Sequence, residues 1–176
     1  MEKNEYVSMT EPGRLELKRV FPSTPEQVWA YLVEDEHRRK WFCGGDVEPR
    51  VGGVIVFDFD HTRISQSPPP SKYADDCKIR LEGEVLVYDK PNRLVFTWPE
   101  NEGEPTQVSI TLKAVEAGVE LHLVHEKLDS MDYRVGAAAG WHAHFDLLND
   151  IMNDREPRDF WPRHMTLEAE YEERFR

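Results

Sequence analysis

The sequence predicts an α+β fold in which one long helix lies across an antiparallel sheet. A helix is expected over residues 132–153, where Trp141, His144, Phe145 and Leu148 recur at helical spacing and form an apolar stripe. At 1.5 Å per residue this helix would be roughly 33 Å long, long enough to cross a sheet. Its opposite face carries polar side chains, namely His142, Asp146, Asn149 and Asn153. The sheet is indicated by segments that alternate apolar and polar residues with a period of two.

The first half of this helix is nearly free of side-chain bulk. Residues 136–140 read GAAAG, although a glycine inside a helix costs about 1 kcal/mol relative to alanine. Two interpretations remain open. Either the sheet backbone approaches the helix closely here, or a ligand cavity is kept open between helix and sheet.

The elements before the sheet are a strand and two short helices. Residues 14–21 alternate imperfectly and predict a first strand. Thr24 is expected to cap a helix that begins at Pro25, with Gln27 reaching back as the third residue of a capping box. A second, charged helix is expected over residues 35–40.

The middle of the chain is predicted to be an antiparallel meander of about five strands. They are expected at residues 54–60, 78–88, 93–98, 107–115 and 119–128, with a tight hairpin turn at Glu116-Ala117-Gly118. The segment 61–76 carries three consecutive prolines and is predicted to be a long loop. Such a loop is either a disordered excursion or a lid over a binding site.

Three parts of the chain are expected. Residues 1–13 form a flexible leader, residues 14–153 form the domain, and residues 154–176 form an extension with a short helix capped by Thr166. The extension carries aromatic side chains that a free tail would expose: Phe160, Trp161, Tyr171 and Phe175. They are covered either by the same domain or by a second copy, so a homodimer through the extension is one alternative.

The amino-acid composition limits the kinds of binding partner and the cellular location that can be expected. The 34 acidic and 22 basic residues give a net charge of −12, which argues against nucleic acid or an anionic membrane as partner. Two cysteines indicate a reducing compartment. Since neither a signal peptide nor a membrane-spanning run is recognisable, the expected location is cytoplasmic and no membrane insertion is expected.

An ordered set of short motifs carries a family resemblance. The motifs are residues 25–29, Trp41-Phe42, Val51-Gly52-Gly53, Gly83-Glu84-Val85, residues 89–98, residues 121–126 and Gly140-Trp141. In this order they resemble the SRPBCC or START-like superfamily. Within it the chain is similar to the family named after the activator of the 90-kDa heat-shock-protein ATPase, over about residues 14–153.

The resemblance implies a helix-grip fold, in which a curved antiparallel sheet wraps a long C-terminal helix and encloses an apolar cavity. The chain departs from the family pattern in its longer 61–76 loop and in the tail after Asn153. Relatives include binders of lipids, hormones and polyketides, as well as cyclases. The eukaryotic co-chaperone uses an additional N-terminal domain with no counterpart in this sequence, so a co-chaperone role is the less favoured expectation.

A ligand cavity between sheet and long helix is therefore predicted. Its expected lining is Trp41, Phe57, Phe59, Phe96, Trp98, Ile110, Leu123, His125, Trp141, His144, Phe145 and Leu148. By alternation His125 shares a strand face with Leu121 and Leu123, and His144 lies on the apolar stripe. Both imidazoles are then either satisfied core histidines, or groups that orient a polar part of the ligand or act as acid and base.

The expected function is binding of a small hydrophobic molecule, lipid-like or aromatic, without catalysis. One alternative is a cyclase or hydrolase that uses His125 and His144, and another is a protein-interaction module. No metal or other cofactor is expected, because His142 and His144 point about 200° apart on a helix and His122 and His125 point to opposite faces of a strand. No nucleophile motif or phosphate-binding loop is recognisable either.

Overall fold

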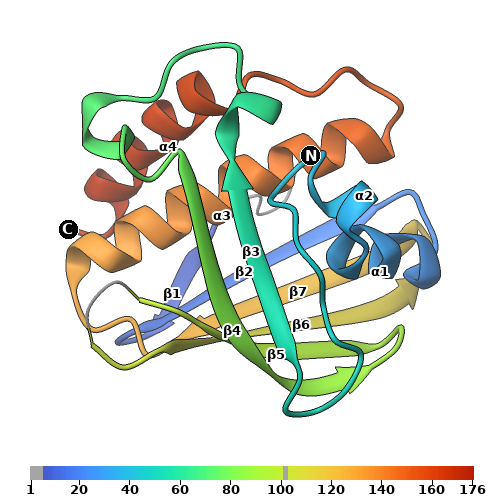
Figure 1. The fold of residues 1–176 in the computed structure, drawn as a ribbon. Coiled ribbons are helices and arrows are strands. Elements are labelled where there is room, and N and C mark those ends of the chain that lie inside the picture. The colour runs from blue at the N-terminus through green and yellow to red at the C-terminus, as the bar shows by residue number, and fades with distance from the viewer. Residues whose placement is uncertain (1–5, 101–102) are drawn as a thin grey trace.

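A long helix, α3 (Met131–Met152), lies across a curved seven-stranded antiparallel sheet (Figure 1). The structure is a computed structural model that describes residues 6–100 and 103–176. The predicted α+β class and the helix-grip architecture are confirmed. Among the described residues, no helix combines the length and apolar character needed to cross a membrane.

The seven strands follow one another around the sheet in the order β1-β2-β7-β6-β5-β4-β3. Their bounds are β1 Ser8–Glu11, β2 Arg14–Phe21, β3 Val54–Asp60, β4 Lys78–Asp89, β5 Arg93–Trp98, β6 Thr106–Val115 and β7 Gly118–Glu126. Each pair of neighbours is antiparallel. The sheet therefore contains the predicted meander together with β1 and β2 at one edge.

The N-terminal prediction was wrong for residues 8–11. These residues form β1, which pairs with β2 across the turn at Pro12 and Gly13. Their side chains are exposed, so the apolar alternation that reveals a half-buried strand is missing there. The first five residues of the expected leader lie outside the described residues.

Two short helices cover one end of the sheet. In α1 (Pro25–Val33) the Thr24 side chain accepts a hydrogen bond from the backbone N–H of Gln27 at 3.3 Å, as predicted. The Gln27 side chain does not reach back to Thr24; it accepts from the hydroxyl of Ser23 at 2.7 Å. The second helix, α2 (Asp35–Arg38), ends two residues earlier than expected.

The sheet opens where β4 changes its partner. The first half of β4 pairs with β3 as far as Glu84, and the second half pairs with β5 from Val85 onward. Strands β4 and β5 approach each other closely at Gly83, where an added Cβ would overlap the carbonyl oxygen of Thr97. Before this point β4 pairs with β3 and no longer with β5, which ends at Trp98.

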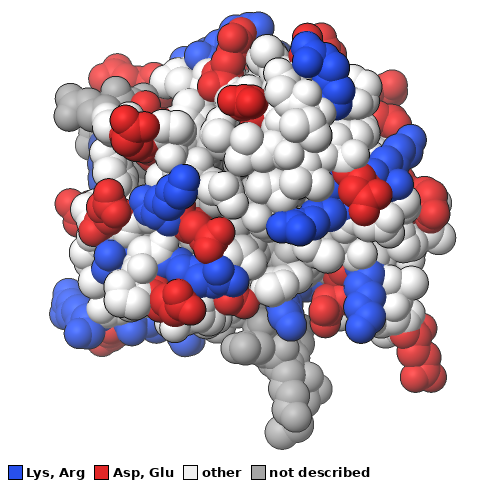
Figure 2. Space-filling view, turned by 90° about the horizontal axis from the view of Figure 1, so that it is seen from below, with Lys and Arg blue, Asp and Glu red and all other residues white. Residues whose placement is uncertain are grey.

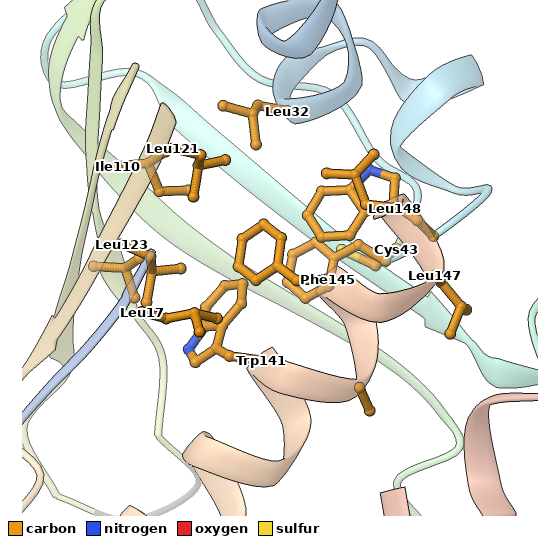
Figure 3. Packing of buried hydrophobic residues seen from close by; sticks show 14 of the residues in the cluster. Leu17, Leu32, Cys43, Ile110, Leu121, Leu123, Trp141, Phe145, Leu147 and Leu148 are labelled. Carbon is orange, nitrogen blue, oxygen red and sulfur yellow. The ribbon is translucent and has the colours of Figure 1, made fainter. Parts of the chain in front are cut away.

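The hydrophobic core lies between the sheet, α1 and the C-terminal half of α3. Figure 3 shows Trp141, Phe145 and Leu148 of α3 packed with Leu17, Ile110 and Leu121 of the sheet. The bulkiest side chains that are almost fully buried include Trp29, Trp41, Phe21, Phe57 and Phe145. This part of the helix is therefore held by dense packing.

The C-terminal extension forms a fourth helix, α4 (Phe160–Arg174), which packs against α3. The prediction of a short helix capped by Thr166 was wrong, because Thr166 lies inside α4 and its hydroxyl donates to the carbonyl of Pro162 at 3.1 Å. Figure 1 shows α4 beside α3, with the 61–77 segment close to it. Phe160, Trp161 and Tyr171 are buried in the domain itself.

Burial of the polar face of α3 depends on charges from α4 and from the preceding segment. Asp146, only 5% exposed, accepts a hydrogen bond from Nε of Arg163 at 2.6 Å. Asp150 accepts from Nε of Arg158 at 2.8 Å. His142 is fully buried beneath α4, and its Nδ1 lies 2.8 Å from the hydroxyl of Tyr171.

Charged side chains elsewhere are mixed in sign. Figure 2 shows one face of the molecule, on which acidic and basic side chains are interspersed around an uncharged area. The described residues of this face therefore form no basic patch of the kind that nucleic acid requires.

Replacing Asp146 with alanine is expected to weaken the attachment of α4. The change removes the carboxylate that pairs with the guanidinium groups of Arg163 and Arg19. Removing one partner of a buried ion pair costs about 3–5 kcal/mol, and partial exposure of Arg163 places the expected loss at about 2–3 kcal/mol. Urea unfolding at pH 7 measures it.

The control is Glu172→Ala on the exposed face of α4, which should change stability by less than about 0.5 kcal/mol. An Asp146→Ala variant as stable as the control would mean that aromatic packing alone holds α4.

Candidate functional site

A cavity of about 540 Å³ lies between the N-terminal half of α3, the start of α4, the open part of the sheet and the 61–77 segment. Its aromatic and histidine lining comprises Phe42, Phe59, His61, Tyr73, Trp98, His125, Tyr133, Trp141, His144, Phe160, Trp161 and His164. Ile79 and Leu81 of β4 and Leu128 add aliphatic surface. The cavity thus begins where β4 no longer pairs with β5.

The small residues of α3 border this space. A methyl group added to Gly136 or Gly140 would have no atom of another element within 4 Å, and both glycines line the cavity. Close approach of the sheet backbone, one of the two interpretations of this segment, is therefore wrong at these glycines. The absence of side chains at these two positions leaves free space beside α3 and does not serve a close contact with the sheet.

The predicted cavity residues divide into two groups. Phe59, Trp98, His125, Trp141 and His144 line the cavity. The others lie in the packed core on the same side of the sheet: Trp41, Phe57, Phe96, Ile110, Leu123, Phe145 and Leu148. Periodicity identifies which side chains point inward, but it does not distinguish inward positions that meet other atoms from those that border space.

The 61–77 segment forms one wall of the cavity and contains two single turns of 3-10 helix, His61–Arg63 and Ser71–Tyr73. The ring of Tyr73 stacks on Trp161 with centroids 5.6 Å apart. Hydrogen bonds tie the segment to the α4 region: Ser65 and Ser67 donate to Asp159. The segment is therefore an ordered wall and not a disordered excursion.

Glu168 of α4 strengthens this attachment. It accepts from Nζ of Lys72 at 2.7 Å and from the hydroxyl of Tyr73. Burial and the hydrogen bond to Glu168 raise the pKa of Tyr73 to about 12. The phenol consequently stays protonated and keeps its bond to Glu168 at neutral pH.

Sequence reasoning missed the cavity residues that come from the 61–77 segment and α4, chiefly His61, Tyr73, Phe160, Trp161 and His164. The available signal was the group of tail aromatics that needed cover. It showed that the tail had to pack somewhere but not on which surface.

His125 belongs to a hydrogen-bonded chain. The indole N–H of Trp141 donates to its Nδ1 at 3.1 Å, so in the neutral ring the proton lies on Nε2. That N–H faces Oγ1 of Thr106 at 2.7 Å, and the Thr106 hydroxyl donates to Glu100 at 3.0 Å. Burial lowers the pKa of His125 to about 3 and raises the pKa of Glu100.

Among the described residues, His144 and His61 each have a hydrogen-bond partner at only one ring nitrogen. Nδ1 of His144 lies 2.8 Å from the carbonyl oxygen of Trp41, and Nδ1 of His61 lies 3.2 Å from that of Cys77. Because a carbonyl only accepts, Nδ1 carries the proton in both rings and Nε2 is left as an acceptor. Burial lowers the pKa of both histidines, and for His144 the neighbouring His61 adds to the shift.

Among the described residues, no group of three or more His, Cys, Asp or Glu side chains is placed to hold a metal ion. His142 turns to α4 and His144 turns to the cavity. The two rings point to different sides of α3, as expected for residues two positions apart in a helix.

Comparison with known families decides the affiliation of the chain. The model described as "Activator of Hsp90 ATPase homolog 1-like protein" matches residues 22–153. The chain belongs to this family. The match covers β3 to β7 and α3. Strands β1 and β2 lie before it, and Phe160, Trp161 and His164 of the cavity lie beyond it.

Solved structures share this fold. The protein encoded by BPP1335 of Bordetella parapertussis is 28% identical, with a TM-score of 0.82 over 95% of this chain and 88% of that one. CalU16 of Micromonospora echinospora is 19% identical, with a TM-score of 0.69 over 92% and 84%. A conserved protein of unknown function from Enterococcus faecalis is 17% identical, with a TM-score of 0.69 over 98% and 90%. A comparison with curated proteins finds no match.

Alanine at Gly136 or Gly140 is expected to stabilise this family member by about 0.5–1 kcal/mol each. The added methyl group meets free space and the backbone at both positions is helical, so helix propensity decides the outcome. Urea unfolding measures the gain. Gly83→Ala is the contrasting control, which should destabilise because its Cβ would overlap Thr97.

The free energy of unfolding is expected to decrease as the pH is lowered from 7 to 5. Five imidazoles have a lowered pKa in the folded protein: His61, His125, His142, His144 and His164. Below the unfolded-state pKa of about 6.5 the unfolded chain binds more protons than the folded one, so each group removes up to about 1.4 kcal/mol per pH unit until its folded-state pKa is reached. Unfolding free energies at successive pH values measure the slope.

Two variants test whether the buried histidines cause this pH dependence. His164, whose pKa burial lowers to about 4, has no hydrogen bond to a described residue, so His164→Phe keeps its ring packing and should flatten the slope. Met165→Leu changes an exposed residue of α4 that carries no titratable group and should keep the slope. Equal slopes in the wild type and the His164→Phe variant would contradict the assignment.

Proposed function

We propose that the protein binds a small, largely apolar molecule in the cavity between the sheet and α3. The observation that carries the proposal is the cavity of about 540 Å³, bordered by aromatic rings and by the glycines of α3. Small-molecule sites typically measure about 300–1,000 Å³ and combine apolar walls with a few polar groups. The size and the lining both fit this class.

The aromatic walls favour a flat or ring-containing ligand. Trp98 and Trp141 meet edge to face with centroids 5.6 Å apart, and Phe42 stacks on Trp141 at 5.2 Å. A ligand that covers these rings removes apolar surface from water at about 25 cal/mol per Å². Ring-to-ring contact adds about 0.5–1.5 kcal/mol per pair.

Binding fits the histidines better than acid–base catalysis does. A general base works best with a pKa near the operating pH, whereas burial lowers the pKa of His125 to about 3 and that of His144 well below its usual value. Both nitrogens of His125 also have partners already. The two residues of the enzymatic alternative are thus neutral, ordered parts of the wall.

Self-association through the extension has less support. Its aromatic side chains Phe160, Trp161 and Tyr171 are buried against the same domain. Cys43 and Cys77 are free thiols, which supports a reducing compartment such as the cytoplasm as the place where binding occurs.

The first experiment is native mass spectrometry of the purified protein, followed by denaturing extraction of any retained mass. A thermal-shift panel of lipids and aromatic compounds accompanies it, since a ligand at 100 times its Kd stabilises by about 2.7 kcal/mol. A protein that retains no molecule and is stabilised by no compound would contradict the proposed function.

A cavity-filling variant locates the binding. Gly136→Phe places a ring in the free space beside α3 and is expected to weaken binding of 2-methoxynaphthalene at least tenfold, measured by quenching of tryptophan fluorescence. Gly136→Ala is the matched control and should bind like the wild type. Equal affinity in both variants would place the ligand elsewhere.

A further inference from the structure

We propose that the histidine end of the cavity recognises an uncharged hydroxyl group, so that the ligand is a hydroxyl-bearing aromatic molecule. This inference rests on the proposed function and adds the chemistry of the polar group. It depends on three residues that the fold brings together from the 61–77 segment, α3 and α4, namely His61, His144 and His164.

The three imidazoles surround one aromatic ring. The centroid of Phe160 lies 4.9 Å from that of His61, 4.4 Å from that of His144 and 5.5 Å from that of His164. The rings of His61 and His144 are 5.8 Å apart. All four residues line the cavity, so three imidazoles are gathered at this end.

Hydrogen bonds to the backbone determine what these rings offer a ligand. Because Nδ1 of His144 and Nδ1 of His61 face carbonyl oxygens, each ring keeps its proton there and presents Nε2 as an acceptor. Neither Nε2 atom has a hydrogen-bond partner among the described residues, and neither is sealed in the packed interior. The cavity therefore offers two acceptors that require a donor.

The third histidine adds further unused hydrogen-bonding capacity. Nδ1 of His164 is buried without a hydrogen-bond partner among the described residues. A buried polar atom left unpaired costs about 1–3 kcal/mol. This nitrogen is itself enclosed, so the acceptors that a ligand can reach are the Nε2 atoms of His144 and His61.

Charge on the ligand is disfavoured. The acidic residues Asp76, Glu100 and Asp132 line the cavity, whereas Lys72, the one Lys or Arg among the described lining residues, is already paired with Glu168. A carboxylate or phosphate would meet these acids and two bare acceptors. These acids would attract a cation, but burying a cation costs far more desolvation free energy than burying a neutral donor. A hydroxyl group donates without carrying charge.

Three matched naphthalenes test the proposal at pH 7.5: 2-naphthol, 2-methoxynaphthalene and 2-naphthoate. Quenching of tryptophan fluorescence gives their affinities, since Trp98, Trp141 and Trp161 line the cavity. The naphthol is expected to bind about tenfold more tightly than the methoxy compound, as one additional hydrogen bond allows. The naphthoate is expected to bind weakest.

Two asparagine variants remove the acceptors and keep the structural bonds. In His144→Asn the side-chain amide can still donate to the carbonyl of Trp41, and in His61→Asn to that of Cys77, but neither has an Nε2 atom. The double variant should bind the naphthol and the methoxy compound equally, whatever its affinity for either of them. His144→Gln, which retains an acceptor near the position of Nε2, should keep the preference.

The outcomes separate the two proposals. Equal affinity of the wild type for the naphthol and the methoxy compound would overturn hydroxyl recognition while leaving ligand binding intact. A preference that persists in the double asparagine variant, or tightest binding of the naphthoate, would also overturn it. A wild type that binds none of the three probes and is stabilised by no compound of the panel would contradict both.

Discussion

The ion pair between Asp146 of α3 and Arg163 of α4 is the interaction on which the form of the cavity depends. The pair, at 2.6 Å, makes it feasible to bury the polar face of α3, because a buried carboxylate needs a partner of opposite charge. Burial of that face fixes α4 beside α3, and α4 brings Phe160, Trp161 and His164 to the cavity. The 61–77 segment is in turn held by Asp159 and Glu168. The ion pair between Asp146 and Arg163 thus helps to position two walls of the cavity, α4 and the 61–77 segment.

The same desolvation governs the protonation and the recognition chemistry of the cavity. Imidazoles that are taken out of water stay neutral, and a neutral imidazole whose Nδ1 donates to a carbonyl presents an acceptor at Nε2. His144 and His61 both meet these conditions. His125, whose two nitrogens are occupied by Trp141 and Thr106, is instead a structural part of the wall. Chemically identical side chains therefore have different roles, because their hydrogen-bond partners differ.

The two glycines of α3 illustrate a conflict between stability and space. Each costs free energy in a helix, and neither is required by a close contact or a left-handed backbone. Gly83 differs, since the approach of β4 to β5 leaves no room for a side chain there. Positions that remain suboptimal for stability are common where function needs an open or unfilled site.

The sequence by itself determined the local elements. The helix expected at residues 132–153 is found at Met131–Met152, Thr24 caps α1, and the strands lie close to their predicted positions. Period, capping and turn chemistry act over a few residues, so they can be read without knowledge of the rest of the chain. The motif order likewise indicated the family.

Only the tertiary structure decided which surfaces are covered. Residues 8–11 carry no buried side chain, so their pairing with β2 depends on a neighbouring strand edge and not on their own pattern. Asp146 and Asp150 of α3 are buried because arginines beyond the end of the helix neutralise them. The cavity lining follows the same rule. Phe145 and Trp141 share one helical stripe, yet only Trp141 borders space, because that distinction depends on packing by segments more distant in the chain.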